Sequence, residues 1–108
     1  MLKRVNRLKK PVRSGGKSFS SKNFILRSAK NSEEVVRAGF IISKKTAKKA
    51  VERNRAKRIF REEMRLLLSR IKGGVDLTFI IKNRSVFENK EGIRKEIEEA
   101  IKKEGLLK

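Results

Sequence analysis

Three short stretches of the chain alternate apolar and polar residues, which is the pattern of half-buried β-strands. They are residues 22–29, 35–43 and 75–82, and the last is apolar enough to lie at the centre of a sheet. Residues 31–34 (NSEE) have the composition of a turn. We therefore expect the first two strands to pair as an antiparallel hairpin.

Two longer stretches repeat apolar residues every three or four positions, which is the period of an amphipathic helix. The longer one is residues 46–71, which two glycines follow as a stop signal. Its apolar stripe consists of Ala56, Phe60, Met64, Leu67 and Ile71. The other is residues 90–104, where the inward positions are Ile93, Ile97, Ala100 and Ile101. The pattern predicts an α+β sandwich of helices on a sheet, with residues 1–108 as a single domain.

The charge of the chain indicates the kind of partner that it binds. Lys and Arg number 31 against 12 Asp and Glu, so the formal net charge is +19. This excess destabilises a compact chain by self-repulsion, which indicates a polyanionic partner: nucleic acid first, an anionic membrane surface second. Residues 73–108 carry eight cations and seven acids, so we expect the polyanion to meet the first two thirds of the chain.

Two missing residue types narrow the chemistry. The chain has no Cys and no His, which excludes thiolate zinc sites and nucleophilic catalysis of the Ser-His or Cys-His type. No apolar run approaches the length of a bilayer span, and the basic first residues lack the apolar stretch of a secretory signal. Because a chain without Cys also suits a reducing compartment, we expect a cytoplasmic protein.

The longer predicted helix carries a second row of residues opposite its apolar stripe. The row consists of Asn54, Arg58, Arg61 and Arg65. A row of nearly one sign is unfavourable on a helix that is merely solvated, because like charges four residues apart repel by about a few tenths of a kcal/mol per pair. A phosphate-binding face is therefore favoured, since the guanidinium of Arg can grip a phosphate through two hydrogen bonds. For Asn54 three roles stay open: a nucleotide contact, a contact to water around Mg²⁺, and a cap near the helix start.

Residues 37–65, RAGFIISKKTAKKAVERNRAKRIFREEMR, resemble the signature region of the bacterial ribonuclease P protein component. The match runs through Arg37, Gly39, Ser43, Lys44, Lys45, Ala50, Val51, Arg53, Asn54, Arg55, Lys57, Arg58, Arg61 and Glu62. Weaker similarity extends to NRLKK near the start and to VDLTFIIK at residues 75–82. Many anchored positions at fixed spacing make this resemblance specific.

The resemblance implies a fold in the order α-β-β-β-α-β-α, the two-layer sandwich also found in the second domain of ribosomal protein S5. In that fold the arginine-rich helix joins two parallel strands by a left-handed crossover. Here the first helix is shortened to the stretch PVRSGG, and an extra short strand fits around residues 17–19. Two structures stay open for the basic residues at the start of the chain: a flexible arm of residues 1–18 in the free protein, or a short helix, which Pro11 and the Gly15-Gly16 pair would keep from being long.

The resemblance also implies a function. The protein would be a monomer bound 1:1 to the catalytic RNA of ribonuclease P, an endoribonuclease whose RNA, with Mg²⁺, removes the 5′ leader of precursor tRNA. No protein side chain would be catalytic, and no metal ligand is assigned beyond Asn54 through water. The residues expected at the catalytic RNA are Lys44, Lys45, Lys49, Arg53, Asn54, Arg55, Lys57, Arg58, Arg61 and Arg65. Those expected at the leader are Lys17, Phe24, Arg27 and Arg37.

Departures from the family pattern affect the leader site most. The aromatic residues that the family's first helix brings to the leader are absent, so leader binding is expected to use less stacking and more charge. Phe19 is a candidate to compensate, although a buried position is the simpler interpretation. We expect Phe40, Phe60 and Phe79 in the core, whereas the place of Phe87 is open.

Two other functions fit parts of the sequence. A ribosomal or other structural RNA-binding protein would have the same composition, and only the signature at residues 37–65 argues against it. A protein nuclease would need acids such as Glu62 and Asp76 to bind metal. A single Asp just before a buried strand is more often a cap or turn residue.

Overall fold

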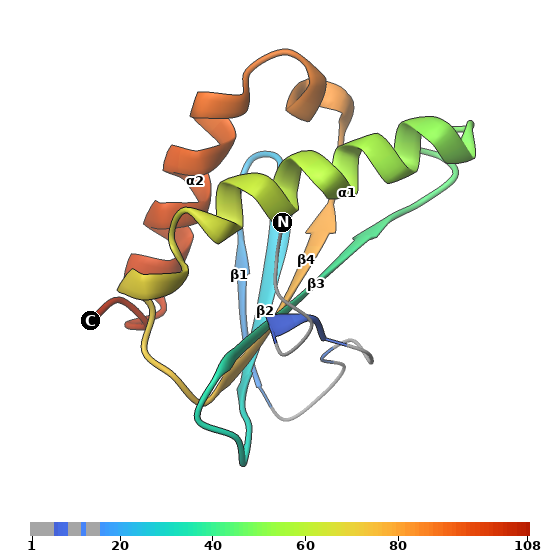
Figure 1. The fold of residues 1–108 in the computed structure, drawn as a ribbon. Helices are drawn as coiled ribbons and strands as arrows, with labels where there is room; N and C mark the ends of the chain where they lie inside the picture. The colour runs from blue at the N-terminus through green and yellow to red at the C-terminus, as the bar shows by residue number, and fades with distance from the viewer. Residues whose placement is uncertain (1–5, 9–11, 13–15) are drawn as a thin grey trace.

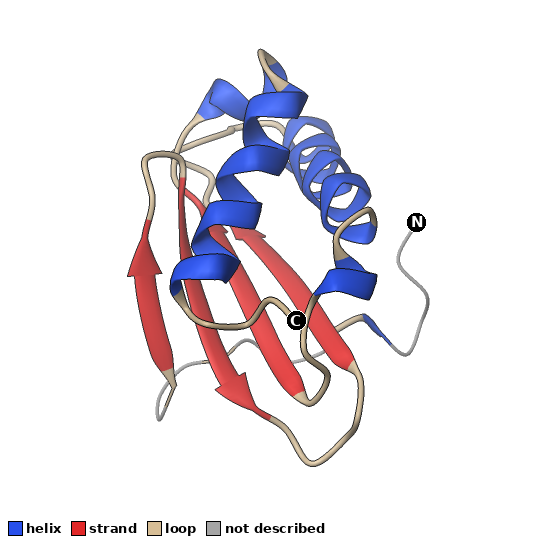
Figure 2. Ribbon diagram, turned by 90° about the vertical axis from the view of Figure 1, so that its left-hand side faces the viewer, coloured by secondary structure: helices blue, strands red, loops and turns tan. Residues whose placement is uncertain are grey.

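The computed structural model describes residues 6–8, 12 and 16–108, in which two helices pack on one face of a four-stranded sheet (Figures 1 and 2). The elements in chain order are β1 (Lys17–Ser20), β2 (Phe24–Lys30), β3 (Val36–Ile42), α1 (Ala50–Arg65), the 3-10 turn η2 (Leu68–Arg70), β4 (Val75–Ile81), the 3-10 turn η3 (Arg84–Phe87) and α2 (Lys90–Lys103). The predicted α+β class is confirmed, and so is the short strand at residues 17–19, which extends to Ser20.

The order of the strands is β1-β2-β4-β3. The hairpin predicted for residues 22–29 and 35–43, now β2 and β3, is therefore wrong. β4 lies between β2 and β3, antiparallel to the first and parallel to the second. It takes the centre because it is the most apolar strand, and only Asp76 and Ile80 in it are not fully buried. In Figure 2 the helices lie on the viewer's side, β3 and β4 point upward and β4 lies left of β3, so the connection through α1 is the expected left-handed crossover.

The loop from β2 to β3 crosses the start of β4, and two glycines allow it. The amide of Asn31 donates to the carbonyl of Gly74 at 2.8 Å, and the amide of Gly74 donates to the carbonyl of Val35 at 3.2 Å. A Cβ on Gly73 would lie 2.4 Å from the carbonyl oxygen of Glu34, and Gly74 has a φ of +80°. The glycines that the sequence marked as a helix stop therefore serve the strand crossing.

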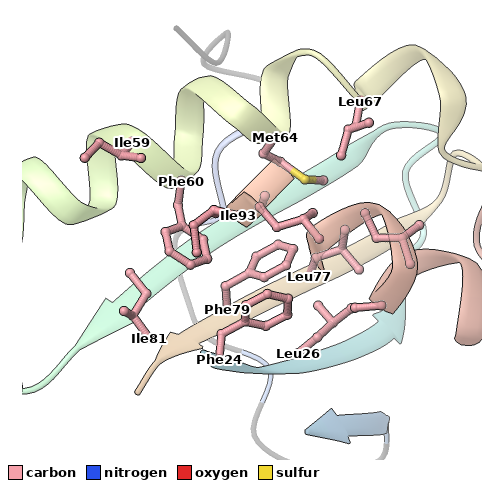
Figure 3. Packing of buried hydrophobic residues seen from close by; sticks show 14 of the residues in the cluster. Phe24, Leu26, Ile59, Phe60, Met64, Leu67, Leu77, Phe79, Ile81 and Ile93 are labelled. Carbon is pink, nitrogen blue, oxygen red and sulfur yellow. The ribbon is translucent and has the colours of Figure 1, made fainter. Parts of the chain in front are cut away.

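The core lies between the helices and the sheet, and phenylalanines form its centre (Figure 3). Phe60 of α1 meets Phe24 of β2 with ring centroids 5.8 Å apart, and Phe24 meets Phe79 of β4 at 5.4 Å. Phe40 of β3 is half-buried and stacks on Phe79 at 5.5 Å. The core positions predicted for Phe40, Phe60 and Phe79 are confirmed.

Helix α1 is shorter than predicted at both ends. It begins at Ala50 rather than 46, because Thr46 and Ala47 donate their amides to the carbonyl of Ser43 in a preceding turn. It ends at Arg65 rather than 71, and the chain continues through η2. The last two residues of the predicted stripe, Leu67 and Ile71, are still buried because this turn returns them to the core. For α2 the prediction is confirmed to within one residue, and the side chain of its N-cap Asn89 accepts from the amide of Gly92.

The stretch PVRSGG, predicted as the shortened first helix, is residues 11–16, of which 11 and 13–15 lie outside the described residues, as do residues 1–5, 9 and 10. Lys17 and Ser18, the last two residues of the predicted arm, belong to β1, the short strand that the sequence also predicted around residues 17–19. The described part nearest the start runs beside the sheet: the amide of Leu8 donates to the carbonyl of Ala38 at 3.0 Å. The amide of Val12 donates to Oγ1 of Thr78 at 2.9 Å, on the sheet face without helices.

Candidate nucleic-acid interface

Helix α1 has one side in the core and one side directed away from it. The buried side consists of Ala56, Ile59, Phe60 and Met64. We call the opposite side the cation face, and it consists of Asn54, Lys57, Arg58, Arg61 and Arg65. Asn54, Arg58 and Arg65 are exposed, while Lys57 and Arg61 are half-buried. The helical spacing thus placed the predicted row of Asn54, Arg58, Arg61 and Arg65 correctly, because an anchored helix cannot rotate its second face away from solvent.

The acids of α1 leave the cation face mostly unneutralised. Glu52 and Glu63 point toward the rest of the domain, where they meet Arg84 at 2.5 Å and Arg94 at 3.7 Å. Among the described residues, Arg65 is the one member of the cation face within ion-pair distance of an acid, with its Nε 3.5 Å from Glu62. No ion pair forms from Lys57, Arg58 or Arg61 to an acid within the described part of the chain. This surface holds unpaired cations at a fixed spacing, which is what a polyphosphate backbone requires.

The loop before α1 extends the positive surface. Lys44, Lys45 and Lys49 are exposed there. Arg53 is half-buried, and its Nη1 donates to the carbonyl oxygens of Ala47 at 2.9 Å and of Lys48 at 2.7 Å. Arg53 therefore holds the loop against the first turn of the helix, a bracing role that sequence reasoning missed because nothing in the spacing indicates a bond to backbone.

The four residues expected at the leader do not lie on one surface. We call the face of the sheet opposite the helices the helix-free face, and register places Arg27 and Arg37 on it. Phe24 lies on the other face and is fully buried, so its assignment to the leader is wrong. Lys17 is exposed on the edge strand, but it pairs with Ser28, whose side chain points toward the helix side. Side chains alternate along β2, so Phe24 and Arg27, three residues apart, lie on opposite faces of the sheet.

Arg37 is committed to a partner within the protein. Its Nε and Nη2 donate to the two carboxylate oxygens of Asp76 at 2.7 and 2.9 Å, and Asn31 donates to the same carboxylate at 2.8 Å. Burial would raise the pKa of Asp76, but the hydrogen bonds from Arg37 and Asn31 outweigh it, so the pKa lies below its ordinary value. The same hydrogen bond raises the pKa of Arg37. This network joins β3, β4 and the β2–β3 loop.

The strands present aliphatic side chains on the helix-free face, where the leader was expected to find aromatic ones. Ile25, Ile80 and Ile41 are direct neighbours across β2, β4 and β3, and Ile41 is 38% exposed. No aromatic side chain of the described strands points to this face. Phe19 pairs with Leu26 and packs on the core from the helix side, so it does not fill that role.

The two acids named for a nuclease site lie apart in the structure. Asp76 lies on the helix-free face and is bonded to Arg37, whereas Glu62 lies on α1, on the other side of the sheet. Across residues 6–8, 12 and 16–108, no three His, Cys, Asp or Glu side chains gather as a metal site would need. Over the same residues, none of the helices has the length and apolar character needed to cross a membrane.

A basic helix anchored on a sheet, with a row of unpaired cations on its outer side, defines the class: a small α+β nucleic-acid-binding domain. A family model described as Ribonuclease P matches residues 2–105. The chain therefore belongs to the family of the ribonuclease P protein component, RNA-binding proteins of bacterial tRNA processing.

Relatives and solved structures agree with this assignment. The chain is 42% identical over 92 residues to the ribonuclease P protein component of Chloroflexus aggregans, covering 81% of this chain and 67% of that protein. It is 33% identical over 102 residues to that of Caldanaerobacter subterraneus, covering 94% and 86%. The RNase P protein of Thermotoga maritima superposes with a TM-score of 0.74 at 28% identity, covering 82% and 83%. That of Staphylococcus aureus gives 0.72 at 26%, covering 99% and 95%.

Proposed function

We propose that this chain is the protein subunit of a ribonuclease P ribonucleoprotein and binds the catalytic RNA through the cation face and the loop of Lys44, Lys45 and Lys49. One observation carries the proposal: Lys57, Arg58 and Arg61 stand on a helix whose other side is fixed in the core, with no acid of the described chain neutralising them. Such a surface displaces counterions from RNA without having to break ion pairs of its own.

The chemical step would belong to the RNA. Membership of the family implies a partner RNA and a precursor tRNA substrate. Mg²⁺ would supply the charge stabilisation for cleavage and would be held mainly by the RNA, since the described protein residues form no carboxylate cluster. From the protein, the exposed amide of Asn54 would reach the ion through water. The arginines of the cation face would hold phosphates in place and lower the repulsion between the folded RNA and its substrate.

The 5′ leader of precursor tRNA would lie on the helix-free face. Arg27 would contact its phosphates, and the row of Ile25, Ile41 and Ile80 would contact its bases or sugars. Arg37 would act through Asp76, by holding β3 and β4 in register, and not as a contact. Because stacking on an aromatic contributes about 1–3 kcal/mol per base, a leader surface without aromatics would depend more on charge and discriminate less between bases.

The complex would contain one protein monomer and one RNA, in the cytoplasm. Cleavage of precursor tRNA at low Mg²⁺ tests the function, with the catalytic RNA alone, the protein alone and both together. We expect cleavage only when both are present, and Arg58→Ala should weaken this rescue. Cleavage by the protein alone would instead indicate a protein nuclease. Failure to rescue the RNA would favour a structural RNA-binding protein.

A further inference from the structure

Phe87, whose place the sequence left open, makes cation–π contacts with two arginines. It lies in η3, half-buried against the core. The guanidinium carbon of Arg55 in α1 lies 5.3 Å from the centre of its ring, and that of Arg84 in η3 lies 5.2 Å from it. Two cations from separate elements thus share one aromatic ring, and the cation–π attraction favours keeping both guanidinium groups beside it.

Arg84 is also held from the side. Its Nη2 donates to Oε2 of Glu52, in the first turn of α1, at 2.5 Å. This hydrogen bond occupies part of a guanidinium that has five donors, and the side chain of Arg84 remains 53% exposed. Two guanidinium groups lie at one ring, and only that of Arg84 is bonded to a carboxylate, so the cluster keeps a positive excess on exposed side chains. Like charges held this close favour an anion between them.

The cluster continues the cation face rather than standing apart from it. A groove of about 260 Å³ lies beside it and is lined by Arg55, Arg58, Ile59, Glu62, Glu63 and Lys90. Arg58 belongs both to this groove and to the cation face. Lys90 opens α2, so three elements supply cations along one path: α1, η3 and the start of α2.

We infer that Arg84 and Arg55, stacked on Phe87, form a second phosphate contact for the RNA that the cation face binds. We call it the η3 contact. The inference rests on the proposed function, because its partner is the same RNA. Phe87 positions the two guanidinium groups, and Glu52 orients that of Arg84. Both guanidinium groups then meet a phosphate of the RNA strand where it leaves the cation face at Arg58. Neither Arg84 nor Phe87 lies in the signature at residues 37–65.

The test compares two arginines that are alike except for the ring. Arg70, in η2, is 52% exposed and bonds Glu98 at 2.5 Å, almost as Arg84 bonds Glu52, but no aromatic ring lies under it among the described residues. The affinity of the intact protein for the catalytic RNA is measured over a series of salt concentrations. Arg84→Gln should lower the log–log salt slope by about 0.7–0.9, which is about fourfold to fivefold weaker binding at about 0.15 M salt. Arg70→Gln should match wild type, and a slope for Arg84→Gln equal to that of Arg70→Gln would overturn the inference.

Two further variants separate a contact from a change of net charge. Glu52→Gln/Arg84→Gln removes an acid and a base together, so the local charge is kept; the slope should stay reduced, and its return to the wild-type value would refute a contact at Arg84. Phe87→Leu keeps both charges and should weaken binding with little change of slope, whereas wild-type affinity would exclude the ring. Arg58→Ala in the same series distinguishes the two proposals. If it lowers the slope while Arg84→Gln does not, the η3 contact is absent but the proposed function stands.

Discussion

Removing the ring of Phe60 tests whether the core side of α1 is what holds the cation face in place. Phe60 is fully buried, and its ring lies 5.8 Å from Phe24 and 6.1 Å from both Phe40 and Phe79. Truncation of a buried Phe to Ala costs about 3–5 kcal/mol. Three aromatic neighbours place Phe60 at the upper end, since each aromatic pair adds about 0.5–1.5 kcal/mol beyond burial. A domain has only about 5–15 kcal/mol of stability in total, so Phe60→Ala should be marginally folded.

Far-UV circular dichroism in a urea titration measures this loss, because the chain has no Trp or Tyr for a fluorescence signal. The matched control is Val51→Ala in the same helix, whose side chain is 75% exposed. It should change stability by no more than about 0.5 kcal/mol. An unchanged urea midpoint for Phe60→Ala, or an equal loss in Val51→Ala, would mean that the two faces of α1 are assigned the wrong way round.

Two other substitutions test the helix-free face. Burial opposes the shift, but the hydrogen bonds from Arg37 and Asn31 lower the pKa of Asp76. The network therefore stabilises the fold at any pH above the unfolded pKa of about 3.9. This contribution is lost as the pH falls through the folded pKa. Asp76→Asn should therefore lower the free energy of unfolding by about 1.5–3 kcal/mol at pH 7. In urea titrations below about pH 4, the difference in unfolding free energy between the variant and wild type should disappear. A difference that does not depend on pH would contradict this. Arg27→Ala should weaken binding of precursor tRNA to the assembled complex by about fourfold to fivefold at about 0.15 M salt, without affecting mature tRNA that lacks a leader. Equal losses for both tRNAs would remove Arg27 from the leader surface.

Local periodicity predicted the elements well. The stripe from Ala56 to Ile71 is buried at each of its five positions, although two of them lie beyond the end of α1. Burial follows from the spacing of apolar residues, whereas helix ends depend on turns such as that at Ser43, which periodicity does not report. The cation face followed from the same spacing, because fixing one side of a helix fixes the other.

Contacts between distant residues were not readable in this way. The turn composition of residues 31–34 suited a hairpin of β2 and β3. Instead β4, which lies more than forty residues after β2, pairs with β2 on that side because β4 is more apolar than β3. Arg37 looked free until Asp76, 39 residues away, was found at its side. Arg84 was one cation in a nearly neutral third of the chain, and two of its neighbours, Glu52 and Arg55, reach it only through the fold.

The claim on which the function depends is that the outer side of α1 binds the phosphates of RNA. It is tested most directly by the salt dependence of the affinity between the intact protein and its catalytic RNA, for wild type, Arg58→Ala and Arg70→Ala. Our account predicts that Arg58→Ala lowers the log–log slope by about 0.7–0.9 while Arg70→Ala leaves it unchanged. A slope for Arg58→Ala equal to that of wild type would contradict it.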